Sequence, residues 1–125
     1  MFDHVKFGVR DYAVSKAFYT SALAPLGVTI VSEGSPGYGI ELASPTSEAS
    51  LCLHQTEEQP APLHISFAAE TRRHVDAFYR EALAAGGRDN RPPGLRPQYG
   101  PTYYAAFVID PDGHNIEAVC HQPEP

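Results

Sequence analysis

Two histidines stand in nearly the same short phrase at different places in the chain. His4 lies in FDHVKF, residues 2–7, and His64 lies in PLHISF, residues 62–67. A carboxylate, Glu117, stands in a third apolar segment near the end of the sequence. Neutral imidazoles and a carboxylate bind divalent metal ions such as Fe²⁺, Mn²⁺, Ni²⁺ or Zn²⁺, and three protein ligands leave positions open for water or substrate. If the fold brings them together, these three residues predict a metal site.

The echo between the two histidine segments extends over a whole module. Shifting the sequence by 60 positions aligns nine identical pairs within residues 4–27, where chance would give about one or two. The pairs are His4/His64, Phe7/Phe67, Ala17/Ala77, Phe18/Phe78, Tyr19/Tyr79, Ala22/Ala82, Leu23/Leu83, Ala24/Ala84 and Gly27/Gly87. We interpret the chain as a duplicated unit of about residues 1–58 and 62–123 within a single domain, 1–125.

Each unit begins with a strand of alternating polarity that is followed by a helix. Asp11 and Thr71 are the expected helix N-caps, and glycines near 27 and 86–87 end the helices. Apolar residues spaced along each helix predict the buried stripe: Val14, Phe18 and Ala22 in the first, and Val75, Phe78, Ala82 and Ala85 in the second.

Signals for three further strands follow each helix. In the first unit they lie near 28–33, 38–43 and 49–54, and in the second near 88–90, 103–109 and 115–121. The motif DPDGH at 110–114 predicts a hairpin turn, and the Pro- and Gly-rich segment 91–101 predicts an irregular loop. The expected fold is α+β, with βαβββ repeated in a curved, mostly antiparallel sheet that has its helices outside.

The alternation of residues predicts which side chains face the concave side of that sheet. Tyr38, Ile40, Leu42, Leu51 and Leu53 should pack against the helices, as should Ile116, Ala118 and Cys120. The opposite parity, facing the cup, contains His4, His64, Glu41, Cys52, His54 and Glu117. His74 on a helix and His114 in a turn are expected to be solvated.

Composition excludes several classes of function. Hydrophobic residues make up 42% of the chain and charged residues 19%, which is typical of a globular protein, and we find no apolar run long enough to span a membrane. The net charge of −6 disfavours nucleic acid as a partner. Two cysteines without paired spacing argue against a disulfide framework, so we expect a reducing, cytoplasmic location.

Taken together, several segments resemble the vicinal oxygen chelate superfamily: DHVKFGVRD, SKAFYTSALAPLG, HISFAA, VDAFYREALAAGG and AFVIDPDGHNIEAV. Its members include glyoxalase I, type I extradiol dioxygenases, fosfomycin-resistance enzymes and bleomycin-resistance proteins. The resemblance implies an incomplete eight-stranded barrel built from two βαβββ units, often in a homodimer. It also implies a divalent metal ion in the cup, chelated by oxygen atoms of the substrate.

By position, the resemblance assigns His4, His64 and Glu117 as metal ligands. Glyoxalase I-like members use a fourth ligand, commonly Glu, where this sequence has Cys52. The remaining two histidines and one glutamate resemble the ligand set of extradiol dioxygenases and fosfomycin-modifying enzymes. Cys52 is either a thiolate ligand of a soft metal or, as we favour, a small buried apolar residue.

The sequence therefore predicts a metal-dependent lyase or dioxygenase acting on a small oxygen-chelating molecule, with the metal as Lewis acid. Glu41 and His54 are candidate general bases. The segment 91–104, with Arg96, Tyr99, Tyr103 and Tyr104, either binds substrate beside Cys52 or serves as a lid or dimer contact. The alternatives are a metal-free binding protein of the bleomycin-resistance type and a metalloprotein without turnover.

Overall fold

The structure is a computed structural model that describes residues 1–58 and 61–123, so residues 59–60 and 124–125 of the predicted domain 1–125 lie outside the described residues. Each module contains the predicted βαβββ order, with a 3₁₀ turn added in the first. The first module consists of β1 (His4–Val9), α1 (Tyr12–Leu23), η1 (Ala24–Leu26), β2 (Thr29–Glu33), β3 (Ile40–Ala43) and β4 (Ser50–Gln55). The second consists of β5 (His64–Ala68), α2 (Arg72–Ala84), β6 (Arg88–Leu95), β7 (Tyr104–Ile109) and β8 (Asn115–Cys120).

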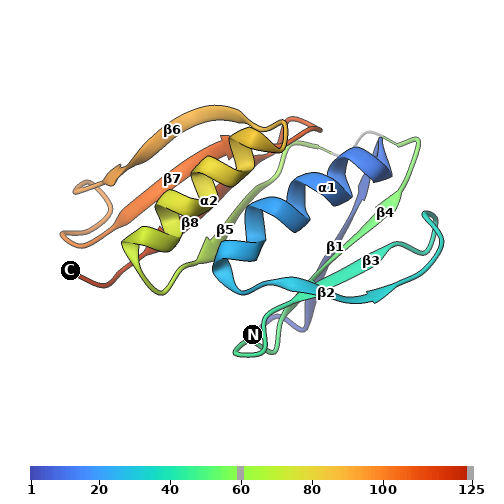
Figure 1. The fold of residues 1–125 in the computed structure, drawn as a ribbon, viewed down its shortest axis with the longest axis horizontal. Coiled ribbons are helices and arrows are strands. Elements are labelled where there is room, and N and C mark those ends of the chain that lie inside the picture. Colours follow the sequence, from blue (N-terminus) through green and yellow to red (C-terminus); the bar gives the residue numbers. More distant parts are fainter. Residues whose placement is uncertain (59–60, 124–125) are drawn as a thin grey trace.

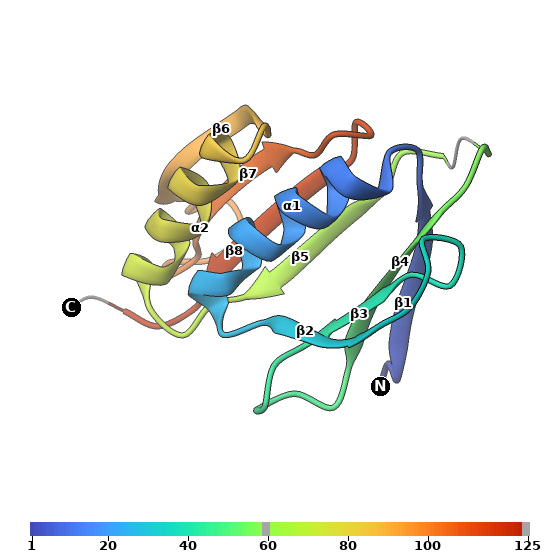
Figure 2. The ribbon, with the colours of Figure 1, turned by 45° about the vertical axis from the view of Figure 1, so that its right-hand side comes forward.

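The strands form two four-stranded sheets with the same internal order, β1-β4-β3-β2 and β5-β8-β7-β6. In each sheet the first and last strands of the module pair in parallel, and the other pairs are antiparallel. Figure 1 shows α1 beside α2 on one side of the molecule, each helix against the sheet of its own module. In Figure 2, β6 and β7 of the second sheet lie behind α2, and the first sheet extends away from them at the lower right. The predicted α+β class and the duplicated module are confirmed, and the eight strands do not close into a barrel within the chain.

Both helices begin at the predicted caps. The Asp11 carboxylate accepts a hydrogen bond from the Val14 amide at 3.2 Å, and the Thr71 hydroxyl accepts one from the His74 amide at 3.2 Å. Val75, Phe78 and Ala82 of the α2 stripe are buried as expected, whereas Ala85 is the C-cap and only half-buried. On α1, Val14 is 46% exposed. Ser15 takes the buried position instead, because the first turn of α1 packs against the turn between β7 and β8, where the Ser15 hydroxyl meets Asp112 at 3.4 Å.

The buried core confirms the predicted alternation of residues in β3, β4 and β8. Residues of both modules form one cluster that includes Ile40, Leu42, Leu51, Leu53, Ile116, Ala118 and Cys120. Tyr38 was wrongly assigned to it and is 69% exposed. The reason is that β3 starts only after Gly39, which has φ +97° and lies so close to β4 that a Cβ would sit 1.9 Å from the Leu53 carbonyl oxygen. Tyr38 therefore lies in the turn before the strand.

β6 is longer than predicted and includes part of the segment expected to be a loop. It runs from Arg88 to Leu95 through Pro92 and Pro93. Proline is compatible with an edge strand because the outer side of that strand needs no amide donors. The pairing with β7 shifts register on both sides of Arg91, which bends the strand. The longer strand places Arg91 on the sheet.

His114 is buried, contrary to the prediction that it is solvated. Its side chain is 1% exposed, its Nδ1 accepts the Leu63 amide at 3.0 Å, and its ring meets the Phe7 ring edge-on at 5.4 Å. The predicted DPDGH turn places it there, with Gly113 at φ +92° and the Asp110 carboxylate accepting the His114 amide at 2.8 Å. His114 thereby links the two modules.

Two further expectations concern compartment and redox state. Cys52 and Cys120 are both free thiols. Within the described ranges, no helix has the length and apolar character needed to cross a membrane.

Candidate metal and substrate site

The centre of the candidate site is a pair of side chains on adjacent strands of the second sheet. His64 on β5 and Glu117 on β8 meet with Nε2 and Oε1 3.0 Å apart. The strands are parallel with His64 opposite Asn115 and Ser66 opposite Glu117, so the pair is a diagonal neighbour on one face. The Glu117 side chain is 3% exposed and that of His64 is 50% exposed. The pair thus joins a buried carboxylate to a solvent-accessible imidazole.

The surroundings of His64 define which of its nitrogens carries a proton. Nδ1 lies 3.2 Å from the backbone carbonyl oxygen of Asn115, which can only accept, so Nδ1 is the donor. In neutral His64 the lone pair of Nε2 therefore faces the Glu117 carboxylate. Two facing acceptors require either a proton shared between Nε2 and the Glu117 carboxylate or a metal ion beside them.

The geometry of the pair fits a metal ion. Metal–ligand distances of 2.0–2.2 Å place the donor atoms of one ion about 3.0–3.5 Å apart. The observed separation between Nε2 of His64 and Oε1 of Glu117 is 3.0 Å, and a backbone carbonyl holding the other imidazole nitrogen is the usual second partner of a metal-bound histidine. The residues present could therefore hold a divalent cation through these two donor atoms.

Tyr103 is hydrogen-bonded to the second carboxylate oxygen of Glu117. Its hydroxyl donates to Oε2 at 2.5 Å. Burial chiefly, and then this hydrogen bond and the charge of Glu117, raise the pKa of Tyr103 to about 12. Tyr103 consequently keeps its proton at neutral pH and orients the carboxylate so that Oε1 faces His64.

His4 does not join this pair within one chain. It lies on β1 in the other sheet, where its Nδ1 contacts the Asp3 carboxylate at 2.7 Å and its side chain is 53% exposed. Across residues 1–58 and 61–123, no group of three or more His, Cys, Asp or Glu side chains is arranged to hold a metal ion. One chain therefore assembles two of the three predicted ligands.

Glu41, Cys52 and His54 lie in the first sheet, on the same strand parity as His4. Cys52 stands opposite Lys6 as Glu117 stands opposite Ser66, so it occupies the equivalent register position. The Glu41 carboxylate accepts a hydrogen bond from the Ser50 hydroxyl at 2.7 Å, and Nδ1 of His54 is buried with no hydrogen-bond partner in the described part of the chain. The structure groups these residues with His4 and not with the His64–Glu117 pair.

The predicted substrate-binding residues are only partly brought together. The ring centroids of Tyr99 and Tyr103 are 5.3 Å apart, and the Arg96 amide donates to the Tyr103 carbonyl at 2.7 Å. Tyr104 points the other way, contrary to the prediction, because its hydroxyl donates to Asp76 on α2 at 2.7 Å. Cys52 is in the first sheet.

A recess of about 210 Å³ lies beside the His64–Glu117 pair. It is lined by Asn90, Arg91, Tyr99, Phe107 and Asn115. Phe107 stands opposite Glu117 on β7 and its ring stacks with His64, with centroids 6.2 Å apart. Phe107 and Arg91 line this recess, although they were not among the residues predicted for the site. The DPDGH turn carried the signal for Phe107, since a hairpin closed there pairs Ile109 with Asn115 and hence Phe107 with Glu117.

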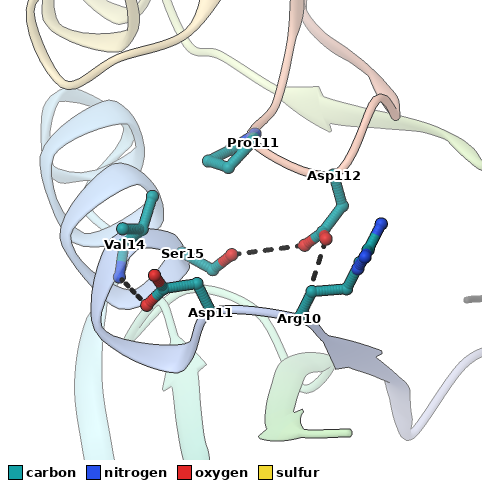
Figure 3. Close-up of a pocket in the computed structure, with 6 residues that line it drawn as sticks. All are labelled: Arg10, Asp11, Val14, Ser15, Pro111 and Asp112. Atoms are coloured by element: carbon teal, nitrogen blue, oxygen red, sulfur yellow. Dashed lines mark hydrogen bonds between the residues drawn. The ribbon is translucent and has the colours of Figure 1, made fainter. Parts of the chain in front are cut away.

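A second recess, of about 260 Å³, lies elsewhere, between the start of α1 and the turn before β8 (Figure 3). Asp11 caps the helix there, and Asp112 accepts from the Arg10 amide and the Ser15 hydroxyl, both at 3.4 Å. These interactions join the two modules. The recess contains none of the predicted site residues, so we do not assign it to the active site.

Comparison with known proteins defines the family. Residues 1–118 match the model of the Glyoxalase/Bleomycin resistance protein/Dioxygenase superfamily, and the chain belongs to this family. A search among curated proteins finds no match to the sequence.

Solved structures show the same fold. A glyoxalase/bleomycin resistance protein from Albidiferax ferrireducens T118 is 33% identical, with a TM-score of 0.78 over 98% of this chain and 99% of that one. The oxidase ChaP-H2 is 22% identical, with a TM-score of 0.70 over 99% and 94% of the two chains. Lactoylglutathione lyase from Agrobacterium tumefaciens is 18% identical, with a TM-score of 0.68 over 96% and 92%. Proteins that share this fold thus include an oxidase and a lyase.

Proposed function

We propose that the protein is a divalent-metal-dependent enzyme that acts on a small molecule through oxygen atoms which chelate the metal. The observation that carries the proposal is the 3.0 Å approach of two lone-pair donors, Nε2 of His64 and Oε1 of Glu117. The family relationship supports it, since similar folds include a lactoylglutathione lyase and an oxidase. The reaction we favour is therefore a glyoxalase-like lyase or isomerase step or an extradiol-type oxygenation.

We further propose that His4 completes the site from a second copy of the chain, in a homodimer. Two facts support this. His4 lies on the predicted concave parity of a sheet that is not joined to the sheet of the pair. Its strand, β1, and the strand of His64, β5, are both edge strands with an unpaired side. A two-fold dimer would place the first sheet of one copy opposite the second sheet of the other.

When bound, the metal would act as a Lewis acid on a substrate oxygen. The residues of the chain have separate tasks around it. Asn115 fixes the tautomer of His64 through its backbone carbonyl, and Tyr103 fixes the orientation of Glu117. Glu41 and His54, on the face that carries His4, are the proposed acceptors for a substrate proton. Among the described residues, Nδ1 of His54 has no hydrogen-bond partner.

The direct test is the metal content of the untagged protein, purified without chelator and also after reconstitution with Fe²⁺, Mn²⁺, Ni²⁺ or Zn²⁺. We expect about one equivalent per chain, lost in His64→Ala and retained in a control, His74→Ala, on α2. Oxygen-chelating substrates would then be screened with and without air. No metal in either preparation would leave the second candidate, a metal-free small-molecule binder, which the recess beside Phe107 favours.

A mixing experiment tests the shared site. His4→Ala and Glu117→Gln chains each lack one ligand. If the ligands come from different copies, mixed dimers regain one intact site, so about a quarter of all sites should bind metal after subunit exchange. If the ligands come from the same chain, mixing restores none. Sedimentation of the separate variants provides the control that both still form dimers.

A further inference from the structure

The recess beside the His64–Glu117 pair is flanked by cations although the chain carries a net charge of −6. Arg91 lines it, and Arg96 lies over the ring of the lining residue Phe107, with its guanidinium carbon 5.7 Å from the ring centroid. Within residues 1–58 and 61–123, neither Arg91 nor Arg96 forms an ion pair with a carboxylate within 4 Å. This part of the surface has positive charge available to a ligand.

The guanidinium of Arg96 is held in place but not fully used. Nη2 donates to the Pro92 carbonyl and Nη1 contacts the Leu95 carbonyl at 3.5 Å, both from β6. Nε is buried and has no hydrogen-bond partner in the part of the chain that the structure describes. A buried donor without an acceptor is costly, so the Arg96 guanidinium keeps unused hydrogen-bonding capacity beside the recess.

Two aromatic side chains, Tyr99 and Phe107, line part of the same recess. Tyr99 is 62% exposed and lies against Tyr103, whereas Phe107 is 9% exposed, with His64 stacked on its ring and the Arg96 guanidinium over it. Asn90 and Asn115 are hydrogen-bonded to each other at 3.2 Å and add uncharged polar groups. The volume of about 210 Å³ is below the roughly 300–1,000 Å³ of sites for drug-sized ligands, so it suits a single ring.

We propose that this recess binds a monocyclic aromatic carboxylate, with the carboxylate toward Arg91 and Arg96 and the ring against Tyr99 and Phe107. Arginine matches a carboxylate because its planar fork makes two parallel hydrogen bonds. Glu117 lies nearby, but its oxygens face Tyr103 and His64. The inference deepens the proposed function and rests on it in one respect: an aromatic acid held here would carry its other ring substituents toward His64.

Calorimetric titration of the metal-free 125-residue chain tests the proposal. The probes are benzoate, its uncharged isostere benzamide, and inorganic phosphate, which has the charge without the ring. We expect benzoate to bind at least about tenfold more tightly than either of the others. Arg91→Gln and Arg96→Gln should each weaken benzoate binding by about tenfold or more. Arg80→Gln, on the exposed side of α2, should leave it unchanged.

Several outcomes would overturn the proposal: equal binding of benzoate and benzamide, tighter binding of phosphate, no binding of benzoate, or no effect of Arg91→Gln. Because Arg96 also bonds to the backbone of β6, circular dichroism must show that its variant is folded, and Arg91→Gln stands as the independent test. Metal uptake without benzoate binding would overturn this inference alone. Benzoate binding by a chain that takes up no metal would overturn the proposed function and support this one.

Discussion

The two modules share one backbone plan but differ at the face that would do chemistry. In the second, His64 meets Glu117 at 3.0 Å, and Tyr103 and a recess adjoin the pair. In the first, the His4 ring is hydrogen-bonded to its neighbour Asp3, and the position equivalent to Glu117 is Cys52. A duplicated fold therefore does not imply a duplicated site.

The difference rests on one register position. β1 and β4 pair as β5 and β8 do, so a residue opposite Lys6 points to the same face as one opposite Ser66. A carboxylate at that position can pair with the first-strand histidine and add an oxygen donor beside the imidazole nitrogen. A thiol at that position adds no oxygen donor. The first module is thus free to offer its histidine elsewhere, and we propose that it offers it to a second chain.

The largest expected effect is on Glu117. Replacing it by glutamine keeps the size of the side chain but removes the anionic donor. The position then lacks a carboxylate, as the equivalent position of the first module does. We expect Zn²⁺ affinity to fall more than about 100-fold, beyond the 10–100-fold typical of outer-shell changes. Competition with a chromophoric chelator measures it. Glu41→Gln is the matched control, and an equal loss there would contradict the contrast between the modules.

Tyr103→Phe should have a smaller effect. It removes only the hydroxyl that donates to Oε2 of Glu117, so metal affinity should fall about tenfold. Tyr104→Phe is the control, because the Tyr104 hydroxyl bonds to Asp76 on the helix side of the sheet. If both variants bind metal equally well, Tyr103 does not position the carboxylate.

The ionisation of Tyr103 gives a pH-dependent prediction. Its pKa is raised to about 12, mainly by burial and then by Glu117, so the folded state binds this proton more tightly than the unfolded state. The resulting stabilisation is complete below about pH 10 and is lost as the pH rises through about 12. NMR of tyrosine ring carbons should show one resonance titrating near pH 12 that is absent in Tyr103→Phe. A Tyr103 resonance titrating near pH 10 would contradict the assignment.

Cys52→Ser is expected to have the smallest effect. If Cys52 is a small residue on the first module's face and not a ligand, metal affinity should change less than about twofold and the stability by less than about 0.5 kcal/mol. Isothermal titration and thermal unfolding measure the two quantities. A large loss of metal affinity would make Cys52 a thiolate ligand and remove the contrast drawn between the modules.

Much of the second module's site was predictable from local patterns. The alternation in β8 places Glu117 opposite the core residues Ile116 and Ala118, and the DPDGH turn sets the hairpin register. The burial of His114 was not predictable, because its partner, Phe7, comes from the other module. Likewise the strand through Pro92 and Pro93 forms because β7 offers an edge, which no local preference of the segment indicates.

The sequence by itself determined the duplicated βαβββ plan, the helix caps and the face on which each candidate ligand lies, since these depend on periodicities of two and 3.6 residues and on turn chemistry. Only the tertiary structure decided which side chains meet. It paired His64 with Glu117 and left His4 apart, and it placed Arg91 and Arg96 around one recess with Phe107. Those outcomes depend on the register between strands and on the separation of the two sheets, which are properties of contacts between distant segments.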